Sequence, residues 1–119
     1  MPDIKSSIID EEKKMGCIAV SGYLDGKSLP EFSEVSEPLL TQGGVIRLIL
    51  DFSDLGFISS AGIGQIVMIR QTLLDQQGKI AIVCNNQRLV SAFRHARLDQ
   101  LIPLYETMDL ALEYLLLPT

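Results

Sequence analysis

Apolar positions along this chain fall into short continuous or alternating runs that are separated by stretches with helical spacing. Residues 4–10 and 15–21 form two strand-like runs on either side of a charged turn, which predicts a β-hairpin. Residues 45–51 and 79–84 are almost entirely apolar, as is typical of central strands covered on both faces. A last short strand is expected within residues 101–105.

Four helices are predicted between and after these strands. The first follows Ser28 and Glu31, whose spacing matches a capping box, and it is expected to be kinked or shortened by Pro38 and to end at Gly43–Gly44. The second covers residues 61–77 and is capped by Gly78, and the others cover 87–96 and 108–116. Inward-facing side chains are expected at Ile63, Ile66, Val67, Leu73 and Leu74 of the second helix, and at Leu112, Leu115 and Leu116 of the last.

The resulting order, β-β-α-β-α-β-α-β-α, predicts one α/β domain over residues 1–119. We expect a mixed, mostly parallel sheet of four to five strands with about four helices, largely on one side of the sheet. Residues 52–60, between a central strand and the second helix, are interpreted as a loop.

Charge and cysteine content narrow the class of protein. The formal net charge is -5, and the longest basic cluster is Lys13–Lys14, which argues against nucleic-acid or membrane-surface binding and suits a basic protein partner. Cys17 and Cys84 each lie in an apolar strand and are interpreted as buried thiols in a reducing compartment. The start of the chain lacks a signal-peptide pattern, so a cytoplasmic protein is expected.

The most informative segment joins the strand that ends at Asp51 to the second helix. Ser59 and Ser60 are both residues that favour a helix N-cap, and a helix N-terminus accommodates a phosphate because it carries partial positive charge and free amides. Gly62 and Gly64 weaken the helix, so they indicate either close approach by a partner or tight packing on the sheet.

Three stretches, residues 22–25 (GYLD), 50–53 (LDFS) and 57–64 (FISSAGIG), resemble the STAS family, and within it the bacterial anti-sigma factor antagonists. The resemblance implies that Ser60 is the phosphorylated serine. Ser59 is the only neighbouring hydroxyl that could compete with it, and it is the less favoured phosphorylation site. Ser59 stands where the family has Asp, and Ala61 where it has a second hydroxyl. Arg97 stands where Gly is common, which indicates either a different turn or a partner contact.

The family likeness also implies a mechanism. The unphosphorylated protein would bind an ATP-binding anti-sigma factor with serine kinase activity and release it once Ser60 is phosphorylated. A PP2C-type phosphatase would then restore the serine. The implied partner-binding residues are Asp25, Ser59, Ser60, Ala61, Gly62 and Ile63.

Other functions remain open at this point. One is a scaffold of the same fold without a phosphate switch. Another is a receiver-like domain phosphorylated on Asp51, which would need further carboxylates for Mg²⁺. A hydrolase built on Ser60 and His95 is disfavoured, because no G-x-S-x-G elbow surrounds the serine. We therefore expect no enzyme, no cofactor and no metal site.

Overall fold

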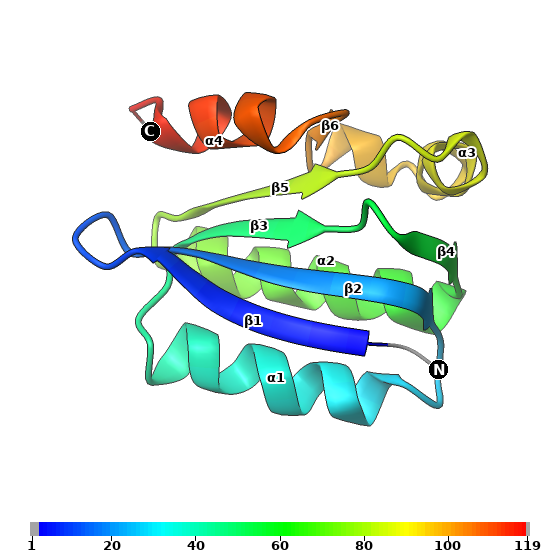
Figure 1. Ribbon diagram of the computed structural model, residues 1–119, viewed down its shortest axis with the longest axis horizontal. Coiled ribbons are helices and arrows are strands. Elements are labelled where there is room, and N and C mark those ends of the chain that lie inside the picture. Colours follow the sequence, from blue (N-terminus) through cyan, green and yellow to red (C-terminus); the bar gives the residue numbers. More distant parts are fainter. Residues whose placement is uncertain (1–2, 119) are drawn as a thin grey trace.

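A computed structural model describes residues 3–118 as a six-stranded sheet with helices on both faces (Figure 1). β1 and β2 form the antiparallel hairpin, and all other strand pairs are parallel. The strand order is β1-β2-β3-β5-β6, with β4 paired to β2 outside this path. The strands are β1 (Asp3–Asp10), β2 (Met15–Leu24), β3 (Arg47–Asp51), β4 (Leu55–Ile58), β5 (Lys79–Val83) and β6 (Leu104–Tyr105).

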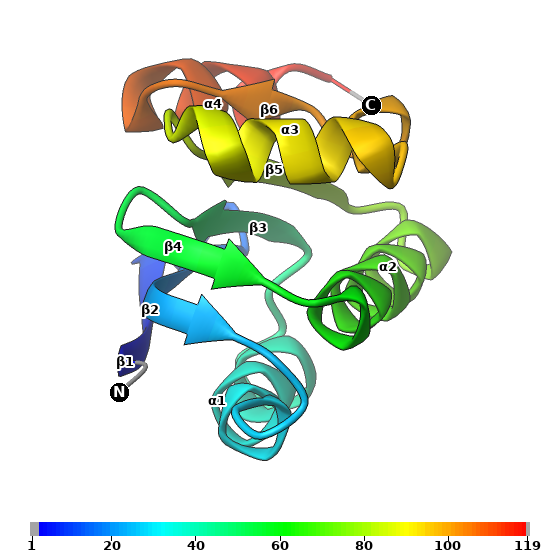
Figure 2. The ribbon, with the colours of Figure 1, turned by 90° about the vertical axis from the view of Figure 1, so that its right-hand side faces the viewer.

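Three of the four helices pack on one face of the sheet. These are α1 (Leu29–Thr41), α2 (Ser60–Asp75) and α3 (Gln87–His95), whose buried side chains share one apolar cluster. α4 (Met108–Leu116) covers the other face and builds a second cluster there (Figure 2). The expectation of helices largely on one side is therefore confirmed for three helices, and α4 departs from it.

Burial on both faces explains the continuous apolar runs of the central strands. In β3, Leu48 and Leu50 point into the cluster under α1 and α2, whereas Ile49 points toward α4. Since successive side chains of a strand alternate between faces, a strand covered on both sides must be apolar at every position. Both predicted central strands are confirmed.

The segment interpreted as a loop contains a strand, β4, and this interpretation was wrong. β4 pairs in parallel with the end of β2, with Leu24 opposite Ile58. Its core-facing residues are Leu55 and Ile58, while Gly56 and Phe57 are exposed. A four-residue strand with only two buried positions has too short an apolar pattern to be distinguished from a loop. The sheet consequently has six strands instead of four to five.

The start and course of α1 also differ from expectation. Ser28 makes no side-chain cap to α1, so the capping box with Glu31 was wrong. The Ser28 hydroxyl instead accepts from the Asp25 amide at 2.9 Å and lies buried in the preceding turn. Pro38 does not shorten α1, which continues to Thr41.

Two leucines and two helix ends also differ from what the sequence predicted. Leu74 and Leu116 are 42% and 52% exposed, so both were wrongly placed in the core. At the end of α2, the left-handed residue is Gln77 (φ 61°) and not Gly78. Arg97 likewise adopts the left-handed conformation (φ 59°) after α3, so the turn expected for a glycine is present with an arginine in it.

Within residues 3–118, no helix combines the length and the apolar character that crossing a membrane requires.

Candidate functional site

Ser59 and Ser60 have different structural roles at the junction between β4 and α2. Ser59 is the N-cap: its hydroxyl accepts from the Gly62 amide at 3.2 Å, and its own amide donates to the Leu24 carbonyl at 2.9 Å. Ser60 is the first helical residue, and its side chain is exposed. The capping role therefore falls to Ser59 alone and leaves Ser60 accessible.

The surroundings of Ser60 favour a negative charge. The first amides of an α-helix have no hydrogen-bond acceptor within the helix. The Ser59 hydroxyl accepts only from the Gly62 amide, so the amides of Ser60 and Ala61 remain free. The first turn of α2 contains no acidic residue. A phosphate on Ser60 would thus lie at the positive end of the helix dipole without a carboxylate of that turn beside it.

The two glycines of this helix differ in what surrounds them. A side chain at Gly62 would place a Cβ 2.9 Å from both the Leu24 carbonyl oxygen and Cγ1 of Ile58. At Gly64, no atom lies within 4 Å of such a Cβ. Tight packing therefore explains Gly62, whereas Gly64 leaves open surface one turn beyond Ser60.

Asp25 lies in the turn between β2 and α1, next to this junction. Its Oδ1 accepts from the amides of Lys27 at 3.0 Å and Ser28 at 3.1 Å, so the carboxylate holds the turn together. The hydrogen bond between Leu24 and Ser59 ties the two turns to each other. Of the other residues expected at the site, Ala61 is exposed, Ile63 is partly buried and Gly62 is buried.

Two aromatic residues beside the junction were not among the predicted site residues. Tyr23 and Phe57 are paired in register on β2 and β4, and they are 36% and 56% exposed. Each immediately precedes a residue of the junction, Leu24 or Ile58. No local pattern in the sequence indicated this pair, because Tyr23 and Phe57 come together only through the pairing of β2 with β4.

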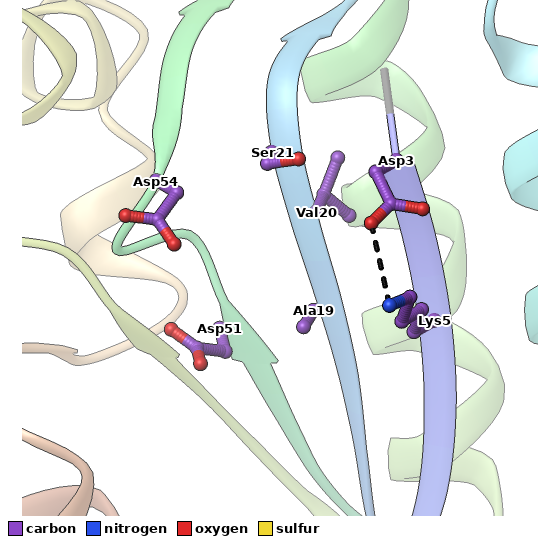
Figure 3. A pocket seen from close by; sticks show the side chains of 7 residues that line it. All are labelled: Asp3, Lys5, Ala19, Val20, Ser21, Asp51 and Asp54. Carbon is purple, nitrogen blue, oxygen red and sulfur yellow. Dashed lines mark ion pairs between the residues drawn. The ribbon is translucent and has the colours of Figure 1, made fainter.

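A hollow of about 130 Å³ lies over β1, β2 and the end of β3, away from the junction (Figure 3). Asp51 and Asp54 lie on one side of it, and Lys5 forms an ion pair with Asp3 at 3.6 Å on the other. Oδ1 of Asp51 accepts from both the amide and the hydroxyl of Ser53.

This geometry does not favour the receiver-like alternative. Asp51 is opposite Ala19 on β2, so Asp25 lies six residues further along, or about 20 Å away. Among residues 3–118, no three His, Cys, Asp or Glu side chains are grouped as metal ligands would be.

His95 lies in the last turn of α3 and contacts its own helix. Its Nδ1 is 3.0 Å from the carbonyl oxygen of Ser91. The structure therefore shows the imidazole engaged with a backbone group, and nothing in this contact supports a nucleophile–base pair with Ser60.

The family model described as the STAS domain matches residues 7–111, which is most of the chain. This chain belongs to the STAS family. No curated protein matches it.

Several solved structures share the fold. An anti-sigma factor antagonist from Mycobacterium paratuberculosis has a TM-score of 0.83 and 21% identity, over 97% of this chain and 94% of that one. A putative anti-sigma factor antagonist from Thermotoga maritima has a TM-score of 0.84 and 21% sequence identity, over 94% of this chain and 93% of that one. The phosphorylated form of SpoIIAA, a Bacillus cell fate determinant, has a TM-score of 0.72 and 18% sequence identity, over 94% of this chain and 98% of that one. At these identities the likeness establishes the fold alone.

The glycine analysis makes a stability prediction. We expect Gly62→Ala to lower the free energy of unfolding by about 1–3 kcal/mol, because its methyl group would press on backbone and on Ile58. Gly64→Ala is expected to raise it by about 0.5–1 kcal/mol, since the new methyl group meets open space and favours the helix. Urea unfolding followed by circular dichroism measures both. Equal effects of the two substitutions would contradict the packing described for Gly62.

The two cysteines are free and buried, as predicted. Burial, and secondarily the carboxylate of Asp51, raises the pKa of the Cys17 thiol from 9.0 to about 11. Burial also raises the pKa of Cys84. Both thiols are therefore protonated and poorly nucleophilic at neutral pH.

The raised pKa predicts a pH dependence of stability. Between pH 9 and about 11 the unfolded chain loses the Cys17 proton while the folded protein keeps it, so the free energy of unfolding falls as pH rises. In urea titrations across this range, wild type should lose more stability than Cys17→Ala. Because the pKa of Cys84 is also raised, the contribution of Cys17 is isolated a second time by comparing Cys84→Ala with the double variant Cys17→Ala/Cys84→Ala, and Cys84→Ala should again lose more stability. Parallel pH profiles for wild type and Cys17→Ala would contradict the assignment.

Proposed function

We propose that this protein is an anti-sigma factor antagonist that switches partners through phosphorylation of Ser60. The observation that carries the proposal is the division of roles at the start of α2: Ser59 caps the helix, and Ser60 presents an exposed hydroxyl. A kinase can reach that hydroxyl without opening the fold. The named solved structures that share this fold include antagonists of anti-sigma factors.

Phosphorylation would alter binding more than it alters the fold. A phosphoserine adds about -1.5 to -2 charges and three acceptor oxygens, and the free amides of Ser60 and Ala61 are oriented to receive some of them. The exposed surface beside it carries Ala61, Gly64 and the aromatic side chains Tyr23 and Phe57. A partner packed closely on that surface would have to accommodate a bulky dianion, which lowers its affinity.

Ser59 in place of the family's Asp is compatible with this switch. Both residue types cap helices, so the serine keeps the structural function that an aspartate has at this position. The substitution also leaves one negative charge fewer beside the phosphate. Ser59 itself is a poorer phosphoacceptor, because it is half-buried and its oxygen is already bonded to the Gly62 amide.

The partners would be an ATP-binding anti-sigma factor with serine kinase activity, and a PP2C-type phosphatase that regenerates Ser60. The chain would act in the cytoplasm without a cofactor and without binding nucleic acid or membrane, in keeping with its net charge of -5. The proposed partner surface comprises Asp25 and residues 59–63.

A non-switching scaffold is the second candidate. It is favoured by one observation, the absence of the Asp that accompanies the phosphorylated serine in the family motif, where this chain has Ser59. In this case Ser60 would be an ordinary first residue of a helix, and partner binding would not depend on its charge.

Affinity capture from the native host, followed by binding measurements on the captured kinase, distinguishes the two. Wild type and Ser60→Ala should retain the kinase, and Ser60→Asp should bind it about 150-fold more weakly, a loss of about 3 kcal/mol. Phosphosite mapping should find phosphate on Ser60.

Ser7→Asp is the matched control for added charge. Ser7 is exposed on β1, opposite Cys17, and lies about 23 Å along β2 from the Ser59 junction. It should leave binding unchanged. If Ser60→Asp binds as tightly as Ser7→Asp and Ser60 never carries phosphate, the scaffold is the correct function.

A further inference from the structure

The helices α1 and α2 lie next to each other on one face of the sheet (Figure 2). Residues of both helices line a groove of about 270 Å³ between them. Leu40 and Ile69 form its buried apolar floor. Glu37 stands on the α1 lip, and Met68 and Thr72 stand on the α2 lip. We call this feature the α1–α2 groove.

Met68 is the most unusual residue of the groove. Its side chain is 65% exposed, more than any other exposed large hydrophobic side chain among residues 3–118. Methionine is unbranched and flexible, which makes it common on surfaces that adapt to partner helices. An exposed methionine above an apolar floor is therefore typical of a docking surface.

The two lips of the groove differ in charge. On α2, the groove residues Met68 and Thr72 and the exposed Ala61 two turns before Met68 are all uncharged, as the centres of protein interfaces commonly are. α1 contains no basic residue, and its exposed Glu37 lines the opposite side of the groove, with the exposed Glu34 one turn before it on the same helix. The groove thus combines an apolar floor with acid on one side.

We propose that the α1–α2 groove binds an amphipathic helix of a protein partner, with the apolar face of that helix on Met68, Leu40 and Ile69. Lysine or arginine side chains at the edge of the same helix would pair with Glu37 and Glu34. Helix-in-groove binding uses an apolar stripe for affinity, and complementary charge sets orientation and specificity. This inference goes beyond the proposed function, because it requires no phosphate and no contact with Ser60.

The chain carries its own reporters for a test by NMR. Of its four methionines, Met68 lies in the groove, whereas Met15 and Met108 belong to the cluster on the α4 face. The intact protein with labelled methionine methyl groups is titrated with two synthetic helical peptides of about 20 residues. Both have the same leucine stripe, and their polar positions are lysine in one and glutamate in the other.

The lysine peptide should shift the Met68 methyl signal and leave that of Met108 in place, and the glutamate peptide should bind at least about tenfold more weakly. Met68→Ser should lower the affinity for the lysine peptide about tenfold, because it removes an apolar contact that the bound peptide would bury. Glu37→Gln should reduce the preference for lysine over glutamate severalfold.

Leu74→Ser and Glu113→Gln are the matched controls. They alter an exposed apolar residue of α2 and an exposed acidic residue of α4, both outside the groove, and should leave peptide binding unchanged. Equal binding of the two peptides, or an equal loss in Met68→Ser and Leu74→Ser, would overturn the proposal. So would sedimentation of the free protein as a dimer that Met68→Ser dissociates, because the groove would then be occupied by a second copy of the chain.

Discussion

The hydrogen bond from the Ser59 amide to the Leu24 carbonyl is the contact on which the proposed site depends. It joins the end of β4 to the end of β2 and thereby sets the point at which α2 begins. Gly62 packs against the same carbonyl oxygen, so the first turn of the helix lies directly on the strand ends. A side chain at position 62 would force the helix away from that oxygen. The position of Ser60 therefore follows from backbone contacts and not from contacts of its own side chain.

The rest of the fold supports this junction from both sides. β4 is short and pairs only with β2, but Leu55 and Ile58 anchor it in the large cluster beneath the sheet. The turn held by Asp25 begins immediately after Leu24, so α1 and α2 both start next to the same strand end. This arrangement explains how a partner surface around Ser60 and a groove between the two helices can exist in one small domain. The α4 face of the sheet is separate from both.

Features set by many residues could be predicted from the sequence, and those set by a few contacts could not. The apolar runs of β3 and β5 required burial on both faces, and both strands were identified from them. Cys17 in the run of β2 and Cys84 at the end of the run of β5 were predicted to be buried for the same reason, and both are. β4 has only two core-facing residues and depends on its pairing with β2, a contact distant in sequence that no local pattern reveals. Leu74 and Leu116 are of a residue type that favours the core, but each lies near the end of its helix and remains exposed.

The candidate site divides in the same way. The pair of serines at a helix start was visible in the sequence, but the capping hydrogen bond that distinguishes Ser59 from Ser60 was not. Both glycines could be explained by packing or by a partner, and only the surrounding atoms assign packing to Gly62. The Ser28 hydroxyl shows the opposite case: a complete capping-box pattern was overridden by the buried turn that Asp25 organises.

The central claim is that α2 presents Ser60 so that its N-terminal amides receive a phosphate within an intact fold. The most direct measurement is the ³¹P NMR titration of the protein carrying phosphoserine at position 60, with phosphoserine at position 7 as the reference. We expect the second pKa of phosphoserine 60 to lie below its ordinary value near 6 and below that of phosphoserine 7, with the folded spectrum retained. An equal or higher pKa than at position 7, or loss of the folded spectrum on phosphorylation, would contradict it.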